Sequence, residues 1–570
     1  MLTLIALATL ATVGEASAPS VYSYQVDPKL MNEMLRKRVS DLCMKGGEVP
    51  AAERRKRLAQ SLGLDPLPPK TELRAQITGV YQRDGYRLEK LRYEARPGEL
   101  VTAHLYMPDG PGPFPVVLNP HGHWSHKKST AHVQSRGISL ALYGYAALIV
   151  DSPGVSWDDN VANERKAMGS HDDWWASMGA SLQGVYVWDL MRGLDYLETR
   201  KDCDTSKVGI TGTSGGGTAT MYAFAMDDRI KAAVPVCYIA SYETATTDGC
   251  LCNHVPGSIL LGDRSDILGI RAPAPAMIIG ATVDADFPLD ATKLAFEKLK
   301  KIYKDKKAED KCRLEIVESN HDYNRRMREA MLAFFAEHLK GEPRRGHLPE
   351  LRPLTDGGDV TYPSGTLDAE NPELLVTKPE ERQTIGMREI LRRSLLEPYP
   401  EAYNVDQRLV RWAKYGRLPE LRPGAIIAIH DSTIEAPKEP NSLPLPVNQL
   451  NQRECIYIGL SVSEVLAQIL HSSLPGAPEG WEANSVLGSD ALTSMIASVK
   501  TLAGSTGPGE PPKMIVAEGP ISSMVAKFLK LYRPDLQIEV SHKWSSWTDL
   551  LDSNIKELSQ PSARYMAWPG

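Results

Sequence analysis

Hydrophobic and polar positions follow two different periods along residues 75–340. Between 75 and 107, apolar residues recur at every second position, with turn signals at Asp84-Gly85 and Pro97-Gly98. This pattern is typical of antiparallel strands. After Pro113, short apolar runs such as AALIVD alternate with longer segments that read as helices. An antiparallel entry followed by strand–helix alternation predicts an α/β fold, with a mostly parallel sheet and helices on both faces.

The same pattern divides the chain into five segments. The first is a short, uncharged apolar stretch that ends in the small residues Ala16-Ser17-Ala18, which indicates a cleaved secretory signal peptide. The fourth is rich in proline and glycine with little periodicity, as in a linker. The predicted segments are a signal peptide (1–18), an N-terminal helical cap or extension (19–74), a catalytic α/β domain (75–341), a linker (342–375) and a second α/β region (376–570).

The second α/β region echoes the first. A strand is predicted at 425–429, a second at 455–458 and a third at 513–517, and helical segments follow the last two. The segment KMIVAEGPIS resembles KVGITGTSGG of the first region. In this alignment the serine of the earlier segment falls on Pro520, which has no hydroxyl group. We therefore predict a truncated, degenerate copy of the same fold without chemistry of its own.

Composition and charge narrow the class of protein. The 570 residues carry a formal net charge of −6 without a basic tail, which argues against nucleic acid as the main partner. Seven cysteines are too few for a disulfide scaffold in a chain of this length. No later segment is long and apolar enough to span a bilayer. Together with the signal peptide, these features predict a secreted or periplasmic protein.

The candidate chemistry centres on residues 207–226, KVGITGTSGGGTATMYAFAM. An apolar strand, a G-x-S-x-G turn and a helix of small residues follow one another, as a nucleophile elbow requires. Glycine at 212 and 216 removes side chains that would clash in so tight a turn. We predict that Ser214 is a nucleophile and that the N–H of Gly215 faces a developing oxyanion.

A serine nucleophile needs a base, and the base needs an orienting acid. His321 directly follows the last predicted strand, where the base is expected in a Ser–acid–His order. Two acids follow the strand AMIIGA: Asp284, which we favour because Pro288 lies four residues beyond it, and Asp286 as the alternative. The N–H of His123, in the loop after the strand at 115–119, is the predicted second oxyanion donor.

Candidate substrate contacts are a set of aromatic and histidine side chains near these loops. Exposed indoles suit sugar rings because apolar C–H faces stack on them, although the same tryptophans could equally belong to the core. Three histidines at 121, 123 and 126 resemble a metal cluster, but the oxyanion loop explains the first two, so we predict neither a metal nor a cofactor. The candidate substrate-binding residues are His121, Trp124, His171, Trp174 and Trp175.

The motifs HGHW, GTSGGG, GATVDADFP and NHDYNRRMREAM resemble those of secreted α/β-hydrolases of the acetylxylan esterase type. The resemblance covers roughly residues 75–340, and related chains carry a decayed second hydrolase domain like 376–570. It implies removal of acetyl groups from plant or algal polysaccharide through an acyl-enzyme. Uronate methyl esterases and feruloyl esterases share these motifs and remain alternatives. A non-catalytic polysaccharide-binding protein is the alternative of a different class.

Overall fold

The computed structural model describes residues 40–41, 43–153, 181–244, 255, 258–351, 354–355 and 362–381, and four strands between 426 and 540. The predicted signal peptide, His171, Trp174 and Trp175 lie outside the described residues. The chain forms two compact units, one mostly of Lys29–Arg408 and the other mostly of Leu409–Ile469 and Gly488–Ala563. In the described parts of both, no helix has the length and apolar character needed to cross a membrane.

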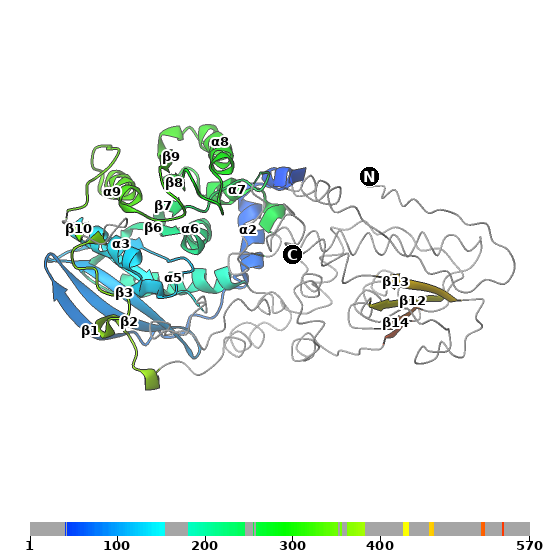
Figure 1. Cartoon of the computed structure of the whole chain (residues 1–570), viewed down its shortest axis with the longest axis horizontal. Coiled ribbons are helices and arrows are strands. Elements are labelled where there is room, and N and C mark those ends of the chain that lie inside the picture. The colour runs from blue at the N-terminus through cyan, green and yellow to red at the C-terminus, as the bar shows by residue number, and fades with distance from the viewer. Residues whose placement is uncertain are drawn as a thin grey trace. The chain divides into compact units, whose positions relative to one another are not determined.

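A nine-stranded sheet forms the centre of the first unit, in the order β1-β2-β3-β5-β4-β6-β7-β8-β9 (Figure 1). The first three strands pair antiparallel, β3 also pairs antiparallel with β5, and all later neighbours are parallel. The predicted mostly parallel sheet with an antiparallel entry is therefore confirmed. The strands are β1 (Gln76–Arg83), β2 (Tyr86–Arg96), β3 (Glu99–Pro108), β4 (Phe114–Leu118), β5 (Ala146–Val150), β6 (Cys203–Thr213), β7 (Ile230–Val236), β8 (Ala276–Ala281) and β9 (Cys312–Val317).

Helices cover both faces of this sheet, and each face has its own hydrophobic core. Strand β5 shows why its sequence is a continuous apolar run: Leu148 packs into one core, and its neighbour Ile149 into the other. Side chains of successive strand residues point to opposite faces, so both must be apolar when both faces are covered. One core contains side chains of α2 (Ala51–Leu62), α5 (Leu182–Glu198), α6 (Gly215–Met226), α7 (Arg264–Leu268) and α8 (Leu289–Asp305), and the other those of α3 (Ala131–Leu142) and α9 (Arg325–Lys340).

The described part of segment 342–375 packs on this unit. Leu348 and Leu374 are buried in the core beneath α3 and α9. The carboxylate of Glu350 forms a buried two-bond ion pair with Arg328, at 2.7 and 3.0 Å. Two short strands in the segment, β10 (Leu354–Thr355) and β11 (Tyr362–Pro363), pair antiparallel. Segment 342–375 therefore contributes to the first unit in its described part, a role that its proline and glycine content does not indicate.

The second unit contains a four-stranded parallel sheet in the order β13-β12-β14-β15. Three of its strands coincide with those predicted from the sequence. Across this sheet, the strand that comes second in the chain lies beside the first, followed by the third and the fourth. The strands β5-β4-β6-β7 of the large sheet have the same arrangement. In that correspondence β14 takes the place of β6, the strand before Ser214. The strands are β12 (Ile426–Asp431), β13 (Cys455–Leu460), β14 (Ile515–Glu518) and β15 (Ile538–Val540).

Candidate active site

Ser214 lies between the end of β6 and the start of α6. Its backbone has φ 57° and ψ −125°, a left-handed conformation that costs about 1–3 kcal/mol in a residue other than glycine. Its N–H donates to the carbonyl of Val236 at 3.1 Å, and its own carbonyl accepts the N–H of Thr218 in the first turn of α6. The conformation is thus fixed from two sides, as expected for a strained nucleophile elbow.

The two glycines that flank Ser214 allow a neighbouring loop to approach. A Cβ atom at Gly212 or at Gly216 would lie 2.4 Å from the carbonyl oxygen of Pro120. A Cβ at Gly212 would also lie 2.6 Å from the carbonyl oxygen of Gly216. The absence of both side chains therefore lets the turn close on itself and lets loop 119–124, which follows β4, pack directly on it.

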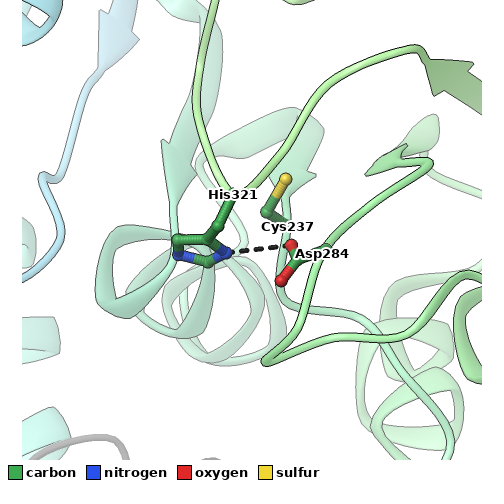
Figure 2. A group of neighbouring side chains, drawn as sticks. All are labelled: Cys237, Asp284 and His321. Atoms are coloured by element: carbon green, nitrogen blue, oxygen red, sulfur yellow. Dashed lines mark hydrogen bonds and ion pairs between the residues drawn. The ribbon is translucent and has the colours of Figure 1, made fainter.

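A carboxylate and an imidazole form a pair beyond the carboxyl ends of the strands, where Ser214 also lies. Nδ1 of His321 is 2.9 Å from Oδ2 of Asp284 (Figure 2). Oδ1 of Asp284 accepts the N–H groups of Asp286 and Phe287, both at 3.0 Å. The imidazole ring stacks on Phe287, with ring centroids 5.7 Å apart. Of the two candidate acids, the structure brings the buried Asp284 to His321 and leaves Asp286 exposed.

This pairing shifts the pKa values of both partners. Burial lowers the pKa of His321, but the hydrogen bond and charge of Asp284 more than offset it, so the pKa lies above its usual value. Burial raises the pKa of Asp284, but the hydrogen bond and charge of His321, together with the two backbone N–H bonds, outweigh burial, so that pKa lies below its usual value. The pair therefore favours a charged carboxylate and a basic imidazole.

The histidine loop is attached to the elbow through the residues next to each. The hydroxyl of Thr213 donates to the carbonyl of Asp322 at 3.4 Å, which joins the neighbours of Ser214 and His321. Asp284 occupies Nδ1, so Nε2 is the nitrogen left for the serine. Among the described residues, Ser214 Oγ and His321 are not hydrogen-bonded to each other, and such bonds often tighten only when substrate is present.

A hollow of about 220 Å³, part of it open to solvent, lies beside the elbow. It contacts both predicted oxyanion donors, Gly215 and His123. Its walls come from the ends of β4 and β5 and from the start of α5, whereas Asp284 and His321 follow β8 and β9 on the other side of β6. The described lining residues are His121, His123, Ser152, Pro153, Leu182, Gln183, Tyr186 and Gly215.

His121 holds loop 119–124 in shape. Its Nε2 accepts the N–H of Ser152 at 3.1 Å, so Nδ1 carries the proton and donates to the carbonyl of Gly122 at 2.8 Å. Its N–H donates to the hydroxyl of Tyr186. Burial lowers the pKa of His121 despite the nearby Asp151 carboxylate, so the ring is neutral. Both ring nitrogens are used within the protein, which leaves neither for a metal or a substrate.

The other predicted contacts fall in different places. The ring of Trp124 packs edge-on against His132 of α3, with centroids 4.2 Å apart, so it faces the protein interior at this edge. His126 lies 3.7 Å from the carboxylate of Glu370. The three histidines of loop 119–126 do not form a metal-ligand cluster in the described part of the chain.

Cys237 is a neighbour of the pair that the sequence did not single out. It directly follows β7, has φ 47°, and its thiol donates to the carbonyl of Asp322 at 3.5 Å. Burial and the charge of Asp284 raise the pKa of this thiol far above its usual range. The available signal was its position, since residues that follow parallel strands gather at one edge of the sheet.

The strand order, the elbow after β6 and the acid and histidine after β8 and β9 define an α/β-hydrolase fold. The family model of X-Pro dipeptidyl-peptidase (S15 family) matches residues 98–324. YtaP, a Bacillus subtilis (strain 168) protein named as a hydrolase, is 25% identical over 288 residues, which cover 47% of this chain and 93% of YtaP.

Solved structures with similarity to the chain include two esterases. Methylesterase BT1017 has a TM-score of 0.43 and 22% identity, and the match covers 66% of this chain and 78% of the methylesterase. A glucuronoyl esterase from Solibacter usitatus has a TM-score of 0.42 and 16% identity, with 51% of this chain and 92% of that protein covered.

Proposed function

We propose that the chain is a serine carboxylic-ester hydrolase that removes acetyl or similar small acyl groups from polysaccharide. The observation that carries this proposal is the hydrogen-bonded Asp284–His321 pair, whose loop is attached to the strained elbow of Ser214. Nucleophile, acid and base follow one another along the chain as Ser214, Asp284 and His321, which is the order in other α/β-hydrolases. The sequence resemblance to acetylxylan esterases supports an ester as the substrate, whereas the peptidase family model supports only a serine hydrolase.

In the proposed reaction, Ser214 Oγ attacks the ester carbonyl carbon while Nε2 of His321 takes its proton. Asp284 stabilises the imidazolium through Nδ1, and the N–H groups of Gly215 and His123 bind the oxyanion. The bond between the carbonyl carbon and the sugar oxygen then breaks, and the proton from His321 goes to that oxygen, so the sugar leaves with a neutral hydroxyl group. A water molecule, deprotonated by the same imidazole, hydrolyses the acyl-enzyme and restores Ser214.

The arrangement of the strands distinguishes the two sides of the ester. The leaving alcohol must lie next to His321, because that imidazole protonates it, and His321 approaches Ser214 from the side of β8 and β9. The acyl group then extends toward the opposite side, where the hollow beside Gly215 lies. Leu182 is an apolar residue of its lining. A small acyl group with a sugar as leaving alcohol fits this arrangement better than a uronoyl acyl group with methanol leaving.

A peptidase is the second candidate, and the match of residues 98–324 to the X-Pro dipeptidyl-peptidase model favours it. The same nucleophile, base and acid would cleave an amide, so the geometry around Ser214 does not separate the two reactions. The decision rests on the leaving group and on recognition of a free N-terminus. An X-Pro dipeptide anilide must therefore be included among the substrates tested.

The test is a substrate panel with the full chain and its Ser214→Ala variant. The panel contains p-nitrophenyl acetate, acetylated xylan, a methyl-esterified uronate, a feruloylated glycan and the X-Pro anilide. We expect turnover of the acetyl esters and its loss in Ser214→Ala with an unchanged circular dichroism spectrum. A fluorophosphonate probe should label the wild-type chain alone. Activity that survives in Ser214→Ala, or turnover confined to the anilide, contradicts the proposal.

Export and the role of the second unit are parts of the same proposal. A signal peptide at 1–18 predicts that the exported protein begins at Pro19, which N-terminal sequencing of secreted material tests. The matching strand order of the small sheet supports a degenerate copy of the hydrolase fold. Because Pro520 takes the serine position, fluorophosphonate should label no residue of 376–570.

A further inference from the structure

Potential metal-ligand atoms of three kinds lie close together around His321. The sulfur of Cys237, a carboxylate oxygen of Asp284 and a ring nitrogen of His321 all lie within 4.8 Å of one another. They follow the three adjacent strands β7, β8 and β9. Figure 2 shows the thiol and the carboxylate on one side of the imidazole and its second nitrogen on the other. Thiolate, carboxylate and imidazole are the ligands that Zn²⁺ takes in proteins.

The spacing is close to what coordination requires. Tetrahedral bonds of about 2.1 Å place a nitrogen and an oxygen ligand about 3.4 Å apart. The present separation of Nδ1 and Oδ2 is 2.9 Å, and the sulfur is at most 4.8 Å from either. Zinc–sulfur bonds of about 2.3 Å call for a sulfur about 3.6 Å from the other ligands. Shifts of about 0.5 Å for the ring and about 1 Å for the sulfur bring the three atoms to these separations.

The surroundings already hold two of the ligands in orientation. Oδ1 of Asp284 is hydrogen-bonded to two backbone N–H groups. Oδ2, which pairs with the N–H of His321, is therefore the oxygen that would bind a metal in place of that hydrogen bond. Cys237 is fixed by its own N–H, which donates to the carbonyl of Ile279 at 2.9 Å. Contacts of this kind to the atoms behind the ligands increase metal affinity because they reduce the ordering needed on binding.

Charge balance also favours a divalent ion. Before binding, the three groups carry one negative charge in total, on Asp284. Zn²⁺ bound by a thiolate, a carboxylate and a neutral imidazole gives a group of zero net charge, which costs less to bury than an ion. The thiol proton passes to solvent, because a coordinated thiol is deprotonated outright. The Nδ1 proton of His321 is replaced by the metal, and Nε2 takes up a proton from solvent. No electron is transferred.

We propose that Cys237, Asp284 and His321 form a binding site for a thiophilic divalent cation such as Zn²⁺, and that its occupancy stops hydrolysis. With the metal on Nδ1, the proton of the neutral imidazole lies on Nε2. That nitrogen then cannot accept the proton of Ser214. The metal acts as a switch on the base and takes no part in the reaction. The inhibitory effect rests on the proposed function, whereas the binding site itself does not.

The first experiment measures binding without activity. Full-length Ser214→Ala protein, freed of metal by a chelator, is titrated with Co²⁺, which gives an intense near-ultraviolet band when a thiolate binds it. We expect this band to appear and to vanish in Ser214→Ala/Cys237→Ser. The matched control is Ser214→Ala/Cys312→Ser. Cys312 is also buried, but it lies at the amino end of β9, whereas the proposed ligands follow the carboxyl ends of the strands. A band that persists without Cys237, or that never forms, overturns the site.

The second experiment measures the switch. Zn²⁺ is titrated into wild-type, Cys237→Ala and Cys312→Ser protein during hydrolysis of p-nitrophenyl acetate, and each rate is normalised to the metal-free rate of that variant. Loss of a ligand should raise the half-inhibitory zinc concentration by about tenfold or more for Cys237→Ala alone. Equal inhibition of all three proteins contradicts the switch.

Two further comparisons keep these outcomes interpretable. If Cys237→Ser does not fold, Ser214→Ala/Asp284→Asn keeps the thiol and must still weaken the cobalt band. If no ester or anilide is hydrolysed by any variant, the proposed function fails, but a cobalt band that requires Cys237 still establishes the site. If the esters are hydrolysed but no thiolate band forms with cobalt, the proposed function holds and the metal site is refuted.

Discussion

Replacement of Asp284 by asparagine tests the acid directly, because the two carboxylate oxygens have different partners. Oδ1 accepts two backbone N–H groups at 3.0 Å, and Oδ2 faces Nδ1 of His321 at 2.9 Å. Asparagine has one oxygen and one NH₂ group. The oxygen is needed by the two N–H donors, so the NH₂ group is turned toward the imidazole. A donor there favours the tautomer with a bare Nδ1 and a proton on Nε2.

The expected cost follows from that tautomer. A histidine with its proton on Nε2 cannot take the serine proton, and the analogous change in a serine protease lowers kcat about 10⁴-fold. This factor corresponds to about 5 kcal/mol of activation free energy. The fold should be retained, because the amide keeps the two backbone hydrogen bonds that order the loop. The effect should therefore fall on kcat, with only a small change in KM.

The assay is steady-state hydrolysis of p-nitrophenyl acetate, and Asp286→Asn is the matched control. Asp286 lies two residues away, is exposed, and was the second candidate acid in the sequence. We expect its variant to stay within about twofold of wild type, since exposed positions remote from the reacting atoms have small effects. If Asp284→Asn keeps more than a tenth of the wild-type kcat while Asp286→Asn loses it, the assignment of the acid is wrong.

Three further outcomes follow from the geometry. His321 must be neutral to act as a base, and its pKa lies above the usual 6.5, so kcat/KM should rise with pH through a midpoint above 6.5. A midpoint below it would contradict the net effect of the carboxylate at Nδ1. Gly216→Ala places a Cβ 2.4 Å from the carbonyl oxygen of Pro120, and should lower the free energy of unfolding by about 1–3 kcal/mol and reduce activity. An unchanged thermal melt and rate would show that this loop moves freely. Glu350→Ala removes the buried two-bond ion pair between Glu350 and Arg328 and should destabilise the first unit by about 3–5 kcal/mol in urea unfolding. An unchanged free energy of unfolding would mean that segment 342–375 adds no stability to the first unit, as expected of a linker.

Periodicity predicted the fold because the sheet imposes it. Strand β5 is apolar at every position since both faces are covered, whereas in β1 exposed and half-buried side chains alternate from Thr78 to Arg83. The elbow was also predictable, because a strand, two glycines around a serine and a helix are all local features. The choice between Asp284 and Asp286 was less certain, since both follow β8 and only the fold of the loop turns one inward.

Contacts between segments that are distant in the chain could not be predicted from the sequence pattern. Segment 342–375 has the composition of a linker, yet Glu350 meets Arg328 from α9 and Leu374 enters the core. These contacts depend on how the chain returns to the sheet, which proline and glycine content does not encode. Cys237 was missed for a related reason: one cysteine after an apolar strand has no partner in the sequence, and its neighbours come from two other loops.

The two histidines of the site differ in burial and in the partner of Nε2. His121 and His321 each lie near a carboxylate, Asp151 at 3.5 Å and Asp284 at 2.9 Å. Complete burial lowers the pKa of His121, whereas the hydrogen bond and charge of Asp284 outweigh burial and raise the pKa of the less buried His321. Nε2 of His121 accepts a backbone N–H, so a proton there would break a bond that supports loop 119–124. Nε2 of His321 has no such donor among the described residues, so it can gain a proton. The same side chain therefore acts as a fixed support in one loop and as the proposed base in the other.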